Sequence, residues 1–348
     1  MSRRGLTLMV AGVLTLALGG AGALLPVPYV ALSPGPTENT LGDVKGKPVI
    51  SIKGHQTYPT TGKLSLVTVA YRGGPGARID LLTALRGWMD PTVAVVPEET
   101  IFPKSVSVKE VDQQNIQEMT SSQQDATAAA MNELKIPVKV VVPVGSTQKG
   151  KPAEGKLRAG DAITDVDGAP VQSIEEVAAG VRRHKPGEQV RFGVIRDGKQ
   201  LTVDVGTVAG KDGTIVGVMM ANPKFTFPFT VDVNVGDVGG PSAGLMFSLG
   251  IYDKLTPGAL TGGMSIAGTG TITADGKVGP IGGIQQKMVG ARDAGATIFL
   301  TPADNCDEAV QAVPKGLRLV KVSTMHEAVQ AIDKLRAGSG QVAGCPAR

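Results

Sequence analysis

The pattern of apolar and polar residues predicts short strands and helices that follow an apolar N-terminus. Residues 47–52 and 63–71 are rich in β-branched residues in near alternation, which predicts two strands. Residues 79–89 have apolar residues at helical spacing, and Pro91 ends that pattern. We therefore predict a β-rich module over residues 33–120.

A second set of elements predicts a compact domain over residues 121–206. Residues 121–134 form a helical pattern that starts at a serine. Residues 173–184 form an amphipathic helical pattern with a capping box made by Ser173 and Glu176. Around this helix, β-branched strands are joined by Asp-Gly pairs, which favour tight hairpin turns.

The last part of the chain alternates short strands and helices. This pattern, with glycine-rich junctions from residue 207 to residue 336, is typical of an α+β domain. Residues 337–348 are mostly small, and we predict a flexible tail there. The fold class predicted for the whole chain is therefore α+β and multidomain.

The N-terminus predicts export. Arg3 and Arg4 precede residues 5–25, an apolar stretch without charge that is long enough for a transmembrane helix. Because a positive flank stays in the cytoplasm, we predict a single-pass anchor over residues 1–32 and an extracytoplasmic body at the cell membrane. A cleaved signal peptide is the alternative, since residues 21–23 have small residues at cleavage-site spacing.

Composition excludes several classes of function. Aromatic residues make up 3% of the chain and the net charge of +4 is spread out, so we expect no nucleic-acid partner. Two cysteines and three scattered histidines do not make a metal site, and we expect no metal. In an exported chain, Cys306 and Cys345 could pair as a disulfide or remain two separate thiols.

The first candidate for chemistry is Ser242, in a Gly-Gly-Pro-Ser-Ala-Gly run over residues 239–244. Glycines precede the serine, and proline suits the first turn of a helix, so we predict Ser242 at a helix N-terminus. Free N–H groups of a first turn can stabilise an oxyanion, and Gly240 leaves room for a substrate backbone. Taken alone, Ser242 is better explained as a helix cap, because a Gly-Pro-Ser run marks a turn in most proteins.

The second candidate is Lys287, in a predicted helix that closes at Gly295. Ile284, Met288 and Ala291 make an apolar stripe, and Lys287 lies on it. A buried amine has a lowered pKa and can act as a general base near neutral pH. Taken alone, Lys287 could also be a lysine whose stem covers apolar surface while its charge reaches solvent.

The motifs around these two residues resemble one family. The run at 239–244, a Thr-Gly-Thr-Ile-Thr strand that begins at Thr269, a glycine-rich hairpin and Lys287 occur in the order found in Lon proteolytic domains. The resemblance spans about residues 230–302. It implies Ser242 as nucleophile, Lys287 as general base and Thr269 as the residue that orients the lysine, with Gly240 in support.

The second domain resembles a bacterial PDZ domain over about residues 121–206. This resemblance rests on a Leu-x-x-Gly-Asp turn at residues 157–161 and on the two Asp-Gly hairpins. PDZ domains bind peptides by strand addition and hold the peptide carboxylate on backbone N–H groups. The resemblance implies Leu134, Lys135 and Ile136 as the loop that binds the carboxylate.

Considered as a whole, the chain resembles membrane-anchored bacterial peptidases with a PDZ domain and a Lon-type proteolytic domain. The resemblance implies a serine endopeptidase with a Ser–Lys dyad that hydrolyses unfolded or extended protein segments without ATP or a cofactor. The phosphate-loop spacing at residues 145–151 is followed by Pro152 in place of Ser or Thr, so we expect no ATP site. The alternative is a non-catalytic, membrane-anchored PDZ scaffold. Lon-type domains often form rings, so the resemblance also implies a homo-oligomer. It does not give the number of subunits.

Overall fold

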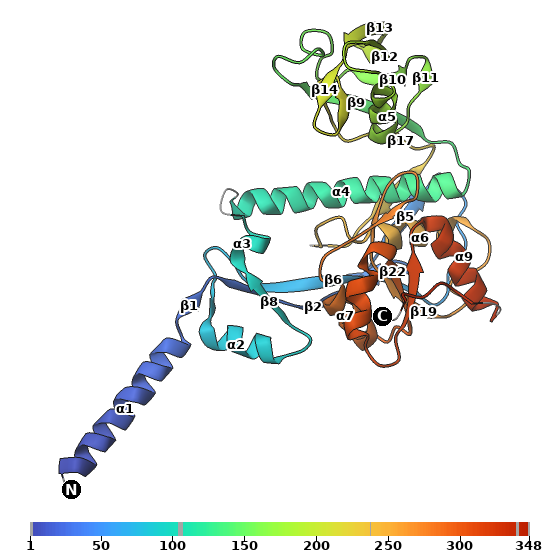
Figure 1. The fold of residues 1–348 in the computed structure, drawn as a ribbon. Helices are drawn as coiled ribbons and strands as arrows, with labels where there is room; N and C mark the ends of the chain where they lie inside the picture. Colours follow the sequence, from blue (N-terminus) through green and yellow to red (C-terminus); the bar gives the residue numbers. More distant parts are fainter. Residues whose placement is uncertain (1–2, 104–106, 237, 339–340, 347–348) are drawn as a thin grey trace. The chain divides into compact units, whose positions relative to one another are not determined.

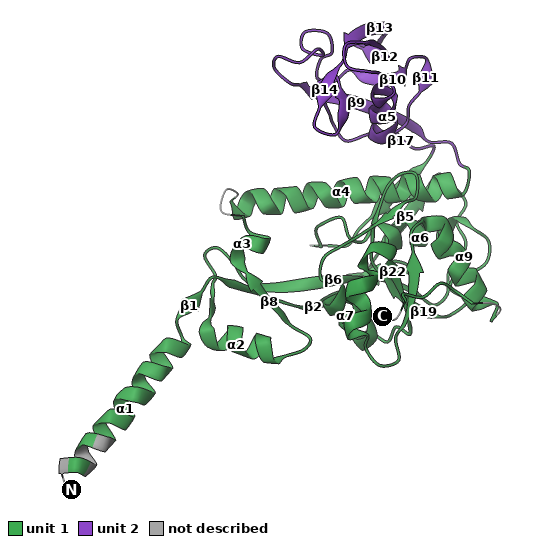
Figure 2. Cartoon of the chain, viewed as in Figure 1, with its two compact units in different colours: residues 1–135, 229–348 green, residues 136–228 purple. Residues whose placement is uncertain are grey.

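The computed structural model describes residues 3–103, 107–236, 238–338 and 341–346. The chain divides into two compact units (Figures 1 and 2). Unit 1 consists of residues 1–135 and 229–348, and unit 2 consists of residues 136–228. Unit 2 is therefore an insertion within the sequence of unit 1.

A six-stranded sheet in unit 1 joins both halves of its sequence (Figure 1). The strand order is β23-β22-β19-β6-β2-β8. The bounds are β2 Tyr29–Asn39, β6 Lys63–Gly73, β8 Ala94–Pro97, β19 Ser265–Gly268, β22 Ile298–Pro302 and β23 Arg318–Val322. Because β6 and β19 pair side by side, the β-rich module predicted at 33–120 and the domain predicted at 207–336 fold as one unit.

Four longer helices pack in unit 1: α4 Val108–Glu133, α6 Gly244–Leu255, α7 Ile284–Asp293 and α9 Met325–Arg336. α6 and α7 contact β6, and α4 contacts α6. α4 starts at a capping box formed by Ser107 and Glu110. The helix predicted over residues 121–134 is the second half of α4. Its residues 126–131 are buried, and the helix belongs to unit 1, whereas residues 136–206 of the predicted PDZ domain lie in unit 2.

The remaining elements of unit 1 are mostly short. Strand pairs are β1 Pro26–Val27 with β7 Ile79–Asp80, β3 Asp43–Val44 with β4 Lys47–Pro48, β5 Ile50–Lys53 with β18 Thr230–Val233, and β20 Thr271–Ile272 with β21 Val278–Gly279. The helices are α2 Leu81–Met89, α3 Glu98–Ile101, η1 Ala303–Asn305, α8 Cys306–Ala309 and η2 Val310–Ala312. The pairing of β5 with β18 again joins the two halves of the sequence.

The N-terminal helix is present, but a membrane span is not supported. Helix α1 runs over Arg3–Ala23. A span needs about 20 consecutive apolar residues. Within the described part of the chain, no helix is long and apolar enough to cross a membrane. The single-pass anchor predicted over residues 1–32 is therefore not supported. The structure has a helix in this part of the chain, but no membrane span is established for it.

The C-terminal segment is fastened to unit 1. Cys306, the first residue of α8, forms a disulfide with Cys345, which decides between the two alternatives for the cysteines. Lys321 N–H in β23 donates to the carbonyl of Ala343 at 2.8 Å. Residues in the predicted flexible tail thus have both a covalent and a hydrogen-bonded link to the preceding elements.

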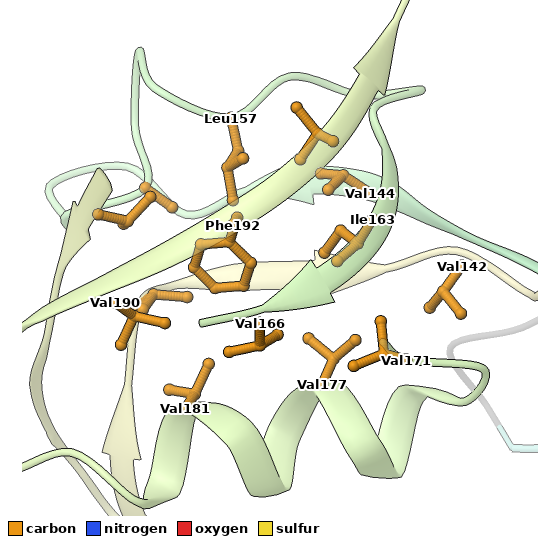
Figure 3. Close-up of a cluster of buried hydrophobic side chains, with 14 residues drawn as sticks. Val142, Val144, Leu157, Ile163, Val166, Val171, Val177, Val181, Val190 and Phe192 are labelled. Atoms are coloured by element: carbon orange, nitrogen blue, oxygen red, sulfur yellow. The ribbon is translucent and has the colours of Figure 1, made fainter. Parts of the chain in front are cut away.

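Unit 2 is a small β-domain with a helix. Its strand order is β13-β12-β10-β9-β16, with β11 on β10 and β17 on β9. Figure 3 shows Val177 and Val181 of α5 facing Val166 and Phe192 in the core. The bounds are β9 Lys139–Thr147, β10 Ala162–Val166, β11 Ala169–Pro170, α5 Ile174–Arg182, β12 Gln189–Arg196, β13 Lys199–Gly206, β14 Val208–Gly210, β15 Gly213–Ile215, β16 Val218–Met220 and β17 Lys224–Thr226. Because β16 and β17 pair with β9, the unit extends beyond the predicted boundary at residue 206.

A buried ion pair stabilises unit 2 and gives a testable prediction. Arg196 donates through Nε and Nη2 to the two carboxylate oxygens of Asp161, at 2.7 and 2.6 Å. Asp161 is 1% exposed, and these hydrogen bonds lower the pKa of its carboxyl. Arg196→Lys keeps the charge but cannot make the forked contact. We expect it to lower the stability of unit 2 by about 1–2 kcal/mol, measured by hydrogen exchange of the β10 and β12 amides.

The matched control for this prediction is Arg191→Lys. Arg191 pairs with Asp204, and both side chains are more than half exposed. An exposed pair contributes little to stability, so this variant should leave the exchange of the same amides unchanged. Equal losses of amide protection in the two variants would show that the forked contact between Arg196 and Asp161 stabilises unit 2 no more than the exposed pair does.

Candidate active site

Ser242 lies in a tight turn that is held from several sides. It directly precedes Ala243, the N-cap of α6, so the helix begins two residues later than predicted. Gly240 has a φ of 86°, a conformation that favours glycine, and its N–H donates to the carbonyl of Asn115 at 3.0 Å. Ser122 Oγ donates to the carbonyl of Pro241 at 3.1 Å. Helix α4 therefore supports the turn from one side.

The segment after β19 supports the same turn from the other side. The carbonyl of Ser242 accepts from Thr269 Oγ1 and from Gly270 N–H, both at 2.9 Å. At Gly244, a Cβ atom would lie 2.7 Å from Ile272 Cγ2, so the first residue of α6 must be glycine. The position of Ser242 thus depends on segments far from it in the sequence.

Lys287 is buried on the inner side of α7, as its spacing predicts. Lys287 falls between Ile284 and Met288 on the buried stripe of the helix, and the residue is 4% exposed. Loss of hydration lowers the pKa of its amine from 10.5 to about 8. Nζ donates to Thr269 Oγ1 at 3.3 Å, and Thr269 is fully buried. Lys287 is therefore a buried amine rather than a lysine whose charge reaches solvent.

Thr269 is the bridge between the two candidates. Lys287 Nζ donates to the threonine hydroxyl, and this hydroxyl donates to the carbonyl of Ser242. Among the described residues, no direct hydrogen bond joins Nζ to Ser242 Oγ, and the N–H of Ser242 has no partner. Such contacts often tighten only when substrate is bound. The serine hydroxyl and its N–H are thus available to a ligand.

Both residues line one groove within unit 1. This groove has a volume of about 1040 Å³. Val67, Thr68, Val69 and Tyr71 of β6 form one side, and residues of the first half of α4 form another. The groove therefore brings Ser242 and Lys287 together with a strand and a helix that the sequence did not associate with them.

The residues predicted to bind a peptide carboxylate lie at the end of α4. Leu134 is the C-cap, and its N–H donates to Ala130 O at 3.1 Å. Lys135 has a φ of 57°, and its N–H donates to Asn132 O at 3.0 Å. Two of the three predicted N–H donors already have partners, and Ile136 begins unit 2. Peptide binding at this loop stays a prediction.

Sequence reasoning missed the part that α4 takes in the site. The capping box at Ser107 and Glu110 is a sequence signal that marks the true start of the helix. No local signal could have found the contact of Ser122 with Pro241, which are 119 residues apart. The residues of β6 in the groove were likewise predicted as a strand but not as part of a site.

Two family models match the chain. The model described as PDZ domain matches residues 106–207, and the model described as Lon protease (S16) C-terminal proteolytic domain matches residues 230–335. A solved structure, the PDZ domain of the SdrC-like protein from Listeria monocytogenes, is 30% identical over 23% of this chain and 85% of that chain, with a TM-score of 0.22. The chain is a mixed α+β multidomain protein with a PDZ domain and a Lon-type proteolytic domain.

Curated relatives match the proteolytic part. Lon protease 1 of Bacillus subtilis (strain 168) is 34% identical over 115 residues, which are 31% of this chain and 15% of that protein. Lon protease 1 of Sorangium cellulosum (strain So ce56) is 38% identical over 100 residues, 28% of this chain and 12% of that protein. The chain thus spans only a small part of the length of these relatives.

Proposed function

From a PDZ domain and a Lon-type proteolytic domain in one chain, we propose a serine endopeptidase with Ser242 as nucleophile and Lys287 as general base. The observation that carries the proposal is the environment of Lys287. Its amine is buried, its pKa is lowered to about 8, and Thr269 links it to the turn of Ser242. A neutral amine in this place can accept a proton from a serine hydroxyl near neutral pH.

The reaction is an acyl transfer in two steps. Lys287 Nζ takes the proton of Ser242 Oγ while this oxygen bonds to the scissile carbonyl carbon, and the C–N bond then breaks as Lys287 returns the proton to the leaving amine. Water attacks the resulting ester, again with Lys287 as base, and releases the acid and the free serine. The N–H of Ser242, which has no partner in the described part of the chain, is available to stabilise the oxyanion.

The substrate in this proposal is an unfolded or extended protein segment, and hydrolysis needs no ATP. The first step needs no co-reactant and the second consumes one water, with protons moving through Lys287 in both, so no nucleotide enters the chemistry. A setting outside the cytoplasm is supported by the Cys306–Cys345 disulfide, because disulfides persist in oxidising compartments.

Casein digestion without nucleotide tests this function. The purified chain is expected to cut casein, and Ser242→Ala at the same concentration is expected to leave it intact. Added ATP should not change the rate. Equal cleavage by both proteins would contradict the role of Ser242, and intact casein with the unmodified chain would favour the alternative of a non-catalytic PDZ scaffold.

A further inference from the structure

Strand β6 extends beyond its neighbour β19. β19 pairs with residues 63–66 of β6, from Ser265 opposite Lys63 to Gly268 opposite Leu66. On its other side, β6 pairs with β2 as far as Gly73. Past Leu66, no described strand pairs with β6 on the side of β19. β6 therefore has an open edge from Val67 onward.

The direction of the peptide groups along β6 follows from contacts before and beyond this point. Leu64 N–H donates to Asn39 Oδ1 at 3.1 Å and its carbonyl accepts from Thr40 N–H at 2.9 Å, both toward the end of β2. Lys63 N–H donates to the carbonyl of Met264 at 2.9 Å, toward β19. The peptide groups of even-numbered residues thus point to β2, and those of odd-numbered residues point away from it.

The same alternation holds at the far end of the strand. The carbonyl of Ala70 accepts from Ser33 Oγ at 3.4 Å, so it points toward β2. Its neighbours Val69 and Tyr71, like Val67, must then point their N–H and C=O groups toward the open edge. Among the described residues these backbone groups have no hydrogen-bond partner, and such groups can bind an added strand.

The open edge leads to Ser242. Val67, Val69 and Tyr71 line the same groove as Ser242 and Lys287. β19 ends at Gly268, and the next residue is Thr269, which bonds to both Lys287 and the turn of Ser242. Beyond the end of β19, the groove therefore runs along the open edge of β6. This open edge begins beside the candidate site.

We propose that the substrate binds as an additional β-strand along the edge of β6 from Val67 to Tyr71, with its scissile carbonyl near the end of β19. This inference rests on the proposed peptidase function and names the conformation in which the substrate is held. An edge of this length spans about 13 Å at a rise of about 3.3 Å per residue. It selects unfolded or extended segments, because a helix cannot present its backbone groups to a strand edge.

The walls of the groove indicate which side chains such a strand carries. Of the α4 residues that line the groove, Ile116 and Met119 are apolar, whereas Asp112, Asn115 and Thr120 are polar. At the far end, Tyr71 is 50% exposed and makes an edge-to-face contact with Phe102 at a centroid distance of 5.6 Å. We therefore expect an aromatic or aliphatic substrate residue against Tyr71.

The test uses a ten-residue peptide that spans the casein bond cut fastest by the chain. A set of peptides carries a single N-methyl group at each position in turn. Because only alternate residues of an added strand face β6, kcat/KM is expected to fall by about five- to tenfold at alternate positions and to change little between them. A loss at every position, or at none, would overturn strand addition.

This experiment separates the inference from the function on which it rests. If the unmodified peptide is not cut, or is cut equally by Ser242→Ala, the peptidase proposal fails. If Ser242 is required but the N-methyl series has no period of two, only strand addition fails.

A pair of variants at Tyr71 tests the same edge from the protein side. Tyr71→Ala and Tyr71→Pro both lose the ring, but only the proline loses the N–H that faces the groove. The bonds to β2 are retained in both, since they come from the neighbouring residues. With thermal unfolding measured to confirm folding, kcat/KM should be about fivefold lower for Tyr71→Pro than for Tyr71→Ala. Equal values in two folded proteins would contradict the proposal.

Discussion

Lys287→Met is expected to abolish peptide hydrolysis while it stabilises unit 1 at pH 7. Methionine fills a similar volume on the buried side of α7 and has no charge. At pH 7 the lysine is mostly protonated in both the folded and the unfolded chain, so the folded state carries the full cost of a buried ammonium. The difference between a pKa of 10.5 and one of about 8 corresponds to roughly 3 kcal/mol. Activity should fall by about a thousandfold or more, because the base is removed.

The sign of the effect on stability depends on pH. Between pH 8 and pH 10.5 the unfolded chain binds more protons at Lys287 than the folded chain does, so the stability of the unmodified protein rises through this window. Above pH 10.5 the amine is neutral in both states. The advantage of Lys287→Met should therefore shrink through this window and largely disappear at its upper end.

Urea unfolding at pH 7 and at pH 10 checks this prediction. Trp88 is the single tryptophan and lies in α2, so its fluorescence reports on unit 1. Ser242→Ala is the matched control, since it should lose activity without changing the pH dependence of stability. A Lys287→Met protein that is destabilised at pH 7 would show that burial of the Lys287 ammonium does not lower the stability of the folded state.

The motifs near Ser242 and Lys287 predicted much of the candidate site, because their signals are local. The spacing of Ile284, Met288 and Ala291 placed Lys287 on the buried side of a helix, and the structure has it there. Thr269 contacts both the lysine and the turn of Ser242, which is the place that the family resemblance implied. Whether these residues catalyse a reaction stays a prediction.

The joining of the two halves of unit 1 could not be predicted in the same way. β6 and β19 are about two hundred residues apart in sequence, and a parallel pair has no turn between its strands to mark it. The extension of unit 2 past residue 206, where the predicted PDZ domain ends, could not be predicted for a similar reason. β16 and β17 are short strands, and only their pairing with β9 places them in that unit.

Thr269→Val is expected to lower kcat by about a hundredfold and to move the pH dependence of hydrolysis. In the unmodified chain, activity should rise with pH around a midpoint of about 8, because only the neutral form of Lys287 accepts a proton. Valine keeps the shape of threonine but removes the hydroxyl that accepts from Nζ and donates to the carbonyl of Ser242. The ammonium then loses a hydrogen-bond acceptor, so the pKa of Lys287 should fall further and the midpoint should move to lower pH.

The drop in kcat has a separate cause from the shift of the midpoint. Without the hydroxyl, the carbonyl of Ser242 loses one hydrogen bond and keeps the one from Gly270, and Nζ is no longer held toward the turn. Thr269→Ser restores the hydroxyl and should recover both the rate and the midpoint. A valine variant that loses rate at an unchanged midpoint would mean that Thr269 only supports the fold, and one that keeps both would mean that the lysine is positioned without it.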